Sequence, residues 1–398
     1  MQVKTLPMNV VHIITRMIVG GAQENTLLNC IDLIEQYGDQ VTLITGPSEG
    51  PEGQLLQRFN HPQLRIVEAS ALTRNIKPWQ DWKAYRQIKQ ILREIEPNVV
   101  HTHSAKAGLL GRLAAWKLKI PAVIHTVHGA PFHAYQSKLA RNLFACCERY
   151  AAKRCHRLLC VADAMTDLMV EGRVAPRKQF TTVYSGMEID DYLQANQSRE
   201  QVREEFGFSD DDIVVGKIAR LFHLKGHKYL VEAAKLVIAQ NKNIHFLLVG
   251  DGALRETIES QIKAGGLQKH FHFTGLVPPT DVPKYLGAMD ILAHTSLREG
   301  LARALPQALL AGKAVISFDI DGAREVCLTD KTGILTAPKD VQALSHAIVR
   351  LAEAPELREQ LGATGRAKCR EMYSHQRMTD RIRAIYEEVL QKHLNSSV

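Results

Sequence analysis

The chain has 398 residues, 45% of them hydrophobic, and its 50 basic and 42 acidic residues give a net charge of +8. A chain of this length exceeds the roughly 250–300 residues at which one hydrophobic core stops growing, so we expect two domains of nearly equal size. It has neither the ~18 consecutive apolar residues of a membrane helix nor the apolar run of a signal peptide, which predicts a cytoplasmic protein, and it has no common nucleic-acid-binding motif.

The first half of the chain alternates short apolar runs with helical patterns. A helix follows the GGAQ turn, and apolar residues recur at helical spacing across 82–95. Trp79 and Trp82 open that second helix; they either pack in the core or face a membrane surface, and we favour the core. Strands are expected at 9–15, 40–45, 98–104, 122–129, 158–163 and 180–186.

The second half repeats this alternation, which is typical of parallel sheets that bind ligands at the carboxyl ends of their strands. The polar stretch YSGMEIDDYLQANQSRE interrupts the pattern as a linker would. We therefore place the domains at 1–187 and 188–374, followed by a segment at 375–398 whose helix has no predicted packing partner. Strands are expected at 212–220, 244–250, 270–275, 290–296 and 314–320, with helices at 228–240 and 254–264.

Two glycine-rich turns each follow a predicted strand and precede a predicted helix. VGGAQEN covers residues 19–25, and VGDGALRE covers residues 249–256. Glycine at such a turn lets backbone amides approach a phosphate or a sugar closely. Tight strand-to-helix turns also need glycine for steric reasons alone, so both interpretations remain open.

Charged residues occupy two further loops of the second half. Arg220 and Lys225 lie between a strand and a helix, where they could clamp a diphosphate and stabilise it as it departs. A solvated basic loop is the alternative. Glu299 lies where the strand at 290–296 gives way to a helix that begins near 302, so it either faces a ligand or caps that helix.

Histidines end two neighbouring strands of the first half. His128 follows one apolar run, and His103 and Lys106 follow another. Because these positions are the expected ligand-facing ends of the strands, they are candidates for a binding site. The seven cysteines are irregularly spaced and match no zinc pattern, so we expect reduced thiols and no metal site.

Taken in order, these motifs resemble those of a retaining glycosyltransferase of family 4. The resemblance includes GGAQ, HTHSAKAG, HTVHG, VYSGME, GKIARLFHLKG, VGDG, FTGLVP and REGLARALPQALLAG, and so spans nearly the whole chain. It implies the GT-B fold, in which two Rossmann-like doubly wound parallel-sheet α/β domains face a central cleft. The second domain would hold most of a nucleotide-sugar donor, and the first would hold most of the acceptor.

The resemblance also implies roles for individual residues. Arg220 and Lys225 would clamp the diphosphate, and Glu299 would hydrogen-bond the transferred sugar. His128 would contact that sugar near the reacting centre. The other donor-binding residues would be Gly20, Gly21, Gly250, Gly252, Thr274, Gly275, Val277, Gly300, Leu301 and Gln307, and the acceptor-binding residues would be His103 and Lys106. The family usually carries a glutamate where this chain has Gln307, and an amide can also bind ribose hydroxyls.

The implied reaction moves a hexose-type sugar from a UDP- or GDP-sugar to a saccharide or lipid-linked acceptor, in the synthesis of a cell-surface polysaccharide or glycolipid. The departing diphosphate helps to deprotonate the acceptor, so the reaction needs no protein nucleophile, cofactor or metal. A peripheral contact with the inner face of the cell membrane is left open. Two alternative functions are compatible with the same GT-B fold: a non-hydrolysing nucleotide-sugar epimerase and a non-catalytic binding protein.

Overall fold

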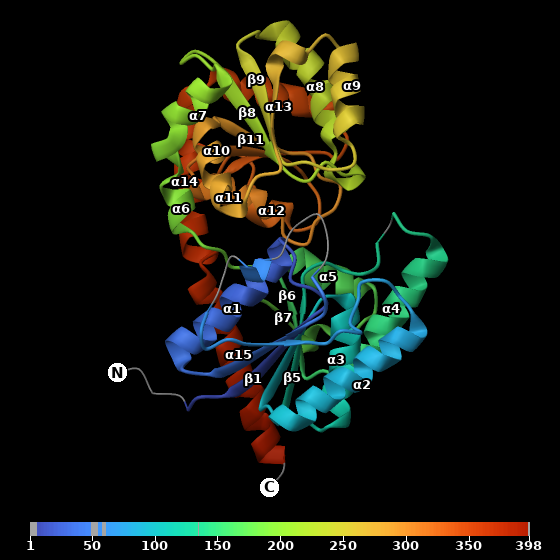
Figure 1. The fold of residues 1–398 in the computed structure, drawn as a ribbon. Helices are drawn as coiled ribbons and strands as arrows, with labels where there is room; N and C mark the ends of the chain where they lie inside the picture. Colours follow the sequence, from blue (N-terminus) through green and yellow to red (C-terminus); the bar gives the residue numbers. More distant parts are fainter. Residues whose placement is uncertain (1–5, 49–54, 58–60, 134, 397–398) are drawn as a thin grey trace. The chain divides into compact units, whose positions relative to one another are not determined.

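A computed structural model describes residues 6–48, 55–57, 61–133 and 135–396. The chain forms two compact units, Met1–Met187 with Ser374–Val398 (unit 1) and Glu188–Tyr373 (unit 2). Each unit contains a parallel sheet flanked by helices (Figure 1). Within the described residues, no helix is both long enough and apolar enough to span a bilayer.

Unit 1 is built on a sheet of seven described strands in the order β3-β2-β1-β4-β5-β6-β7, and every neighbouring pair is parallel. The strands are β1 (Asn9–Ile14), β2 (Gln40–Thr45), β3 (Arg65–Glu68), β4 (Val99–His103), β5 (Ala122–Val127), β6 (Arg157–Cys160) and β7 (Phe180–Thr182). The helices are α1 (Gly21–Tyr37), α2 (Pro78–Ile95), α3 (Ala105–Lys117), α4 (Lys138–Ala152), α5 (Asp163–Glu171) and α15 (His375–Ser396), with short 3-10 turns at Leu55–Gln57 and Arg177–Gln179.

The two faces of the unit 1 sheet contribute to separate hydrophobic cores. Successive side chains of a strand point to opposite faces. Val10 and Ile14 of β1 pack with α1 and α15, whereas Val11 and Ile13 pack with α2 and α3. Because both faces of the sheet are covered, the strand must be apolar at nearly every position, and this explains the continuous run NVVHII.

Helix α15 belongs to unit 1, although it is the last element of the chain. Met378, Ile382, Ile385, Tyr386 and Val389 recur along one face of the helix and lie in the same core as Val10 and Ile14. Ion pairs and hydrogen bonds add to this packing, among them Arg383 with Asp39 at 2.9 Å, His375 with Asp32 at 2.8 Å, and Tyr37 with Asp380 at 2.7 Å. The chain thus returns to unit 1 after completing unit 2.

Unit 2 has a sheet of six described strands in the order β10-β9-β8-β11-β12-β13, again entirely parallel. The strands are β8 (Ile213–Ile218), β9 (Ile244–Val249), β10 (Phe271–Gly275), β11 (Ile291–His294), β12 (Ala314–Phe318) and β13 (Gly333–Thr336). The helices are α6 (Asp190–Leu193), α7 (Arg199–Phe206), α8 (His227–Gln240), α9 (Arg255–Ala264), α10 (Val282–Ala288), α11 (Ala304–Leu310), α12 (Ala323–Val326), α13 (Val341–Glu353) and α14 (Pro355–Met372), with 3-10 turns at Ala195–Ser198, His223–Lys225, Gln268–His270 and Pro279–Asp281.

All eleven predicted strands are present, and the described residues contain two further strands, β3 and β13, that were not predicted. Both are edge strands of four residues. In β3, only one of the four side chains is even half-buried, so the strand lacks the apolar run that signals a central strand.

The preference for core-packed tryptophans at the start of α2 is wrong. Trp79 is 68% exposed and Trp82 is 45% exposed. The buried face of α2 instead consists of Ala84, Ile88 and Leu92, which recur every four residues. The two indole rings stack on each other at 5.0 Å between centroids, outside this face.

Candidate active site

The loop after β8 carries Arg220 and Lys225, and the start of α8 fixes its path. Gly226 has a φ of 66°, and a Cβ at this position would lie 2.0 Å from the carbonyl oxygen of Thr295. The Thr295 hydroxyl also donates a hydrogen bond of 3.0 Å to the Gly226 carbonyl. Glycine is therefore required here, and it holds the Lys225 loop against the segment that follows β11.

This close approach brings together two predicted site residues that lie 74 positions apart. Lys225 Nζ lies 2.5 Å from Glu299 Oε1. The backbone amide of Glu299 donates to Asp321 Oδ2 at 2.6 Å, and Asp321 has a positive φ of 41° that few residues other than glycine adopt. Burial raises the pKa of Glu299, but the charge and hydrogen bond of Lys225, together with His294 and Ser296, outweigh it and leave that pKa below its usual value. Glu299 is thus an ionised, oriented carboxylate.

Two further groups that the sequence analysis did not single out interact electrostatically with this ion pair. Lys217 of β8 is 1% exposed, and its amine has no hydrogen-bond partner among the described residues. Burial, assisted by the charge of Lys225, lowers the pKa of Lys217 to about 7, although Glu299 opposes this shift. His294 Nε2 lies 3.7 Å from Glu299 Oε1, and burial lowers the pKa of His294 to about 3. A lysine within the apolar strand IVVGKI was the signal that could have identified Lys217.

We expect Lys217→Met to stabilise the protein at pH 7 by about 1–3 kcal/mol, because the variant removes a buried amine without a partner. Between the folded pKa of about 7 and the unfolded value of 10.5, the unfolded chain binds more protons than the folded chain. The free energy of unfolding should therefore rise with pH in this window by up to about 1.4 kcal/mol per unit, and Lys217→Met should remove that contribution. Urea unfolding at several pH values measures both effects.

Lys313→Met is the matched control for this experiment. Lys313 is also buried, with a pKa lowered to about 7 by burial, but its amine donates to the Gly287 carbonyl at 2.9 Å. Its replacement should flatten the pH dependence in the same way but lower the stability at pH 7. An unchanged pH dependence in Lys217→Met would contradict the lowered pKa of Lys217.

The two glycines of VGDG have a steric function that the structure makes explicit. A Cβ at Gly250 would lie 2.4 Å from the Ala219 carbonyl oxygen, and one at Gly252 would lie 2.8 Å from that of Leu221. These contacts hold the Arg220 loop against the turn after β9, where the Leu221 amide donates to the Asp251 carbonyl at 2.9 Å. The steric interpretation is therefore sufficient for both glycines, and donor binding by them stays a prediction.

The other donor-binding candidates of unit 2 lie on two loops. Thr274 and Gly275 end β10, and Val277 follows them; the Gly250 amide donates to the Gly275 carbonyl at 3.1 Å. Gly300 and Leu301 lie between β11 and α11, and their amides have no hydrogen-bond partner among the described residues. Two such amides, directly after Glu299, can donate to a sugar hydroxyl or a phosphate.

Gln307 lies on α11, and its side chain has a defined partner. Its Nε2 donates to the hydroxyl of Tyr192 at 2.8 Å. This hydrogen bond orients the amide and leaves its carbonyl oxygen to accept from a hydroxyl group. Ribose binding by Gln307 stays a prediction.

The remaining candidates belong to unit 1. Gly20 and Gly21 lie at the start of α1, and a Cβ at Gly20 would meet only the end of the flexible Gln23 side chain, at 2.7 Å. The half-buried His128 follows β5, and its Nε2 lies 3.1 Å from His103 Nδ1. His103 is 1% exposed. A ligand contact for these residues stays a prediction.

Lys106 begins α3, close to the carboxyl end of β4. Its amine pairs with Asp81 Oδ1 at 2.5 Å and also donates to the carbonyl of Asn75. The acceptor-binding role predicted for Lys106 is untested, and this residue would meet a ligand as part of an ion pair.

The sequence matches two family profiles, one in each half. "Glycosyl transferases group 1" matches residues 198–368, and "Glycosyl transferase 4-like domain" matches residues 21–186. The chain is 26% identical over 347 residues to UDP-Gal:alpha-D-GlcNAc-diphosphoundecaprenol alpha-1,3-galactosyltransferase of Escherichia coli, covering 86% of this chain and 88% of that protein. It is 26% identical over 255 residues to 2-deoxystreptamine glucosyltransferase of Streptomyces kanamyceticus, covering 63% and 66%.

A solved structure shares the fold. The crystal structure of Anabaena Alr3699/HepE in complex with UDP and glucose superposes with a TM-score of 0.81 at 20% identity, covering 96% of this chain and 100% of that one. This likeness confirms the predicted GT-B fold. The chain belongs to the group 1 glycosyltransferases, with a family 4-type domain in its first half, and is a transferase enzyme.

Proposed function

We propose that this glycosyltransferase moves a hexose-type sugar, with retention of configuration, from a nucleoside-diphosphate sugar to a saccharide acceptor in polysaccharide or glycolipid synthesis. The observation that carries the proposal is the Lys225–Glu299 ion pair at the carboxyl end of the unit 2 sheet, followed by the amides of Gly300 and Leu301. A cation suits a diphosphate, and a fixed carboxylate suits sugar hydroxyls. Partial burial of the pair strengthens both interactions.

The donor we propose is a UDP-sugar. The name of the Escherichia coli relative specifies UDP-Gal, and the Anabaena structure contains UDP and glucose. In the proposed reaction, the acceptor oxygen forms a bond to the anomeric carbon on the face from which the diphosphate oxygen departs. The acceptor proton passes to the departing diphosphate. Arg220, Lys225 and the loop amides stabilise the charge that develops on that leaving group.

A cavity in unit 1 supports a lipid-linked acceptor. It has a volume of about 610 Å³, and its lining includes Leu109, Leu143 and Phe144 on the apolar side and Arg16 and Arg74 among its polar groups. The two guanidinium groups have no ion-pair or hydrogen-bond partner among the described residues. Unpaired cations beside an apolar wall fit a saccharide linked through a diphosphate to a long apolar chain. The E. coli relative is named for an acceptor of this class.

The exposed tryptophans of α2 support a peripheral membrane contact for such an acceptor. Lys83 lies over the Trp79 ring and Arg86 over the Trp82 ring, at 5.9 and 4.9 Å from the ring centroids. Indole rings beside cations are suited to the headgroup region of an anionic bilayer. We therefore propose that α2 contacts the membrane that carries the acceptor.

The test is transfer from a panel of UDP- and GDP-sugars to a polyprenyl-diphosphate-linked saccharide, with products identified by mass spectrometry. We expect transfer from a UDP-hexose, with retained configuration by NMR, and faster transfer when the acceptor lies in phosphatidylglycerol vesicles than in phosphatidylcholine vesicles. Conversion of the donor without any acceptor would favour the epimerase. Nucleotide binding without either reaction would favour the non-catalytic alternative.

A further inference from the structure

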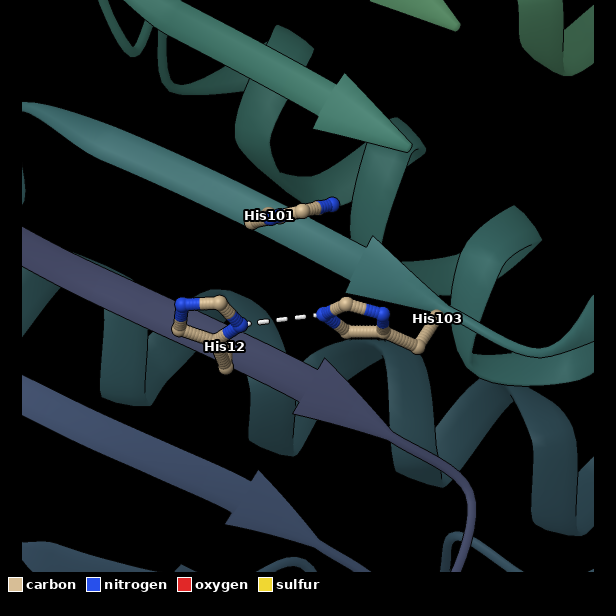
Figure 2. Close-up of side chains that lie close together, drawn as sticks. All are labelled: His12, His101 and His103. Atoms are coloured by element: carbon tan, nitrogen blue, oxygen red, sulfur yellow. Dashed lines mark hydrogen bonds between the residues drawn. The ribbon is translucent and has the colours of Figure 1, made fainter. Parts of the chain in front are cut away.

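Three histidines of unit 1 form a chain of hydrogen bonds across neighbouring strands. His12 Nδ1 lies 2.9 Å from His103 Nε2, and His103 Nδ1 lies 3.1 Å from His128 Nε2. Figure 2 shows the first of these bonds, between β1 and the end of β4. The rings stack, with 5.2 Å between the centroids of His12 and His103 and 5.3 Å between those of His103 and His128. This series of hydrogen bonds therefore runs from the interior of the sheet to the candidate site residue His128.

The two inner histidines are neutral. His12 is 0% exposed and His103 is 1% exposed. Burial lowers the pKa of His12 to about 3 and holds the pKa of His103 well below its usual value. A neutral imidazole has one nitrogen that donates and one that accepts. The two hydrogen bonds must therefore point the same way along the three histidines. Either both donors face His128, or both face His12.

The end of the chain at His12 selects between the two directions. His12 Nε2 has no hydrogen-bond partner among the described residues. If the bonds ran from His128 toward His12, Nε2 would carry a proton as a buried donor without an acceptor, which is rare in proteins. In the other direction, Nε2 retains only an unused lone pair. His12 Nδ1–H then donates to His103 Nε2, and His103 Nδ1–H donates to His128 Nε2.

The same region could be interpreted as a metal site, because nitrogen atoms of His12, His101 and His103 lie within 4.8 Å of one another. The hydrogen bonds argue against this interpretation. Both nitrogens of His101 already have partners, Tyr386 Oη at 2.6 Å and Thr126 Oγ1 at 2.7 Å. The 2.9 Å between His12 and His103 is also shorter than the separation of about 3.3 Å between two imidazole nitrogens on one tetrahedral zinc ion.

We propose that His12 and His103 are positioning residues that hold His128 in one orientation and one tautomer for the transferase reaction. The inference rests on the proposed function and on the predicted contact of His128 with the transferred sugar. Because His128 Nε2 accepts from His103, the proton of His128 lies at Nδ1. His128 thus offers a hydrogen-bond donor to its surroundings and no basic nitrogen. Its role in the reaction is to orient a polar group, and it does not remove a proton.

The kinetic test compares two variants of nearly equal size. Asn at position 103 retains an amide donor near the place of the imidazole Nδ1, whereas Leu does not. We expect His103→Leu to lower kcat by about tenfold or more, as the loss of a partner that orients a functional histidine does elsewhere. KM for the donor should change little, and His103→Asn should recover most of the rate. Equal losses in both variants would show that position 103 acts through packing alone and would overturn the proposal.

The second test observes the tautomer directly and needs no active enzyme. In long-range ¹H–¹⁵N spectra of the histidine-labelled protein, the His128 signals are assigned by their loss in His128→Gln. We expect the Nδ1–H tautomer in the wild-type protein and a mixture in His103→Leu. His125→Leu is the control: His125 is buried and bonded to Thr102 Oγ1 at 2.9 Å, outside the chain, so its loss should leave the His128 tautomer unchanged.

The possible outcomes separate the inference from the proposed function. The Nε2–H tautomer of His128 in the wild-type protein would overturn the inference, whatever the rates. A stoichiometric transition metal in the purified protein, measured by mass spectrometry, would also overturn it. If no donor supported transfer, the proposed function would fail, while the spectra would still decide whether His103 fixes the tautomer of His128.

Discussion

Arg220→Ala should lower the kcat/KM for sugar transfer by about 100-fold or more, with little change in stability, because the removed cation stabilises charge on the departing diphosphate. Arg220 is exposed on the loop after β8, with its guanidinium 5.1 Å from the Phe222 ring centroid. Loss of an exposed side chain costs the fold little. The rate is therefore expected to fall without loss of folded protein. Initial rates of nucleotide release and urea unfolding measure the two quantities separately.

Two further variants make this experiment specific. Arg220→Lys keeps the charge but loses the planar pair of donors that matches a phosphate, so we expect an intermediate rate. Lys228→Ala removes an exposed cation from the neighbouring helix α8, where it lies over the Tyr229 ring at 4.8 Å. That variant should transfer sugar at the wild-type rate. If Arg220→Ala stayed within a few-fold of the wild type, Arg220 would not belong to the diphosphate site.

The central strands of both sheets could be predicted because the apolar residues that they require lie next to one another in the sequence. A parallel strand covered on both faces needs a nearly continuous apolar run, and β1 and β12 have one. The edge strands β3 and β13 pair on one side only and tolerate short or polar sequences. Trp79 and Trp82 were misplaced for a related reason, because apolar spacing alone does not reveal which face of a helix meets the sheet.

The candidate site was predictable only where its residues belong to recognisable loops. Glu299 and Lys225 each follow a strand, and the structure brings them within 2.5 Å. Lys217 was missed, and the hydrogen bond of Asp321 with the Glu299 amide was not predicted, because both depend on residues far away in the chain. For such residues, the local sequence gives only one indication, which is a charged or polar residue inside an apolar strand. This pattern identifies His12 as well as Lys217.

The second large effect is expected at Glu299, where Glu299→Gln should lower kcat/KM for transfer by about 100-fold. Glutamine keeps the size of the side chain but removes the charge that Lys225 and the sugar hydroxyls would share. Because Glu299 already forms the 2.5 Å ion pair, a loss of rate alone has two explanations. The carboxylate could bind the sugar, or it could serve only to hold Lys225 in place.

Binding measurements distinguish these explanations. If Glu299 binds the sugar and Lys225 binds the diphosphate, Glu299→Gln should keep its affinity for UDP and lose the additional affinity for the UDP-sugar. Lys225→Met should weaken the binding of both ligands. Calorimetry with UDP and with a UDP-hexose measures the affinity of each variant for each ligand, for comparison with the wild type. Unfolding experiments report any loss of stability from the broken ion pair.

The double variant Lys225→Met/Glu299→Gln completes the cycle. If Glu299 served only to orient Lys225, its loss would have no further effect once Lys225 was absent, and the double variant would be as active as Lys225→Met. If each residue contacts its own part of the donor, the double variant should be slower than either single variant. That outcome would place the carboxylate at the transferred sugar and the amine at the leaving group. Equal rates for Lys225→Met and the double variant would restrict Glu299 to a structural role.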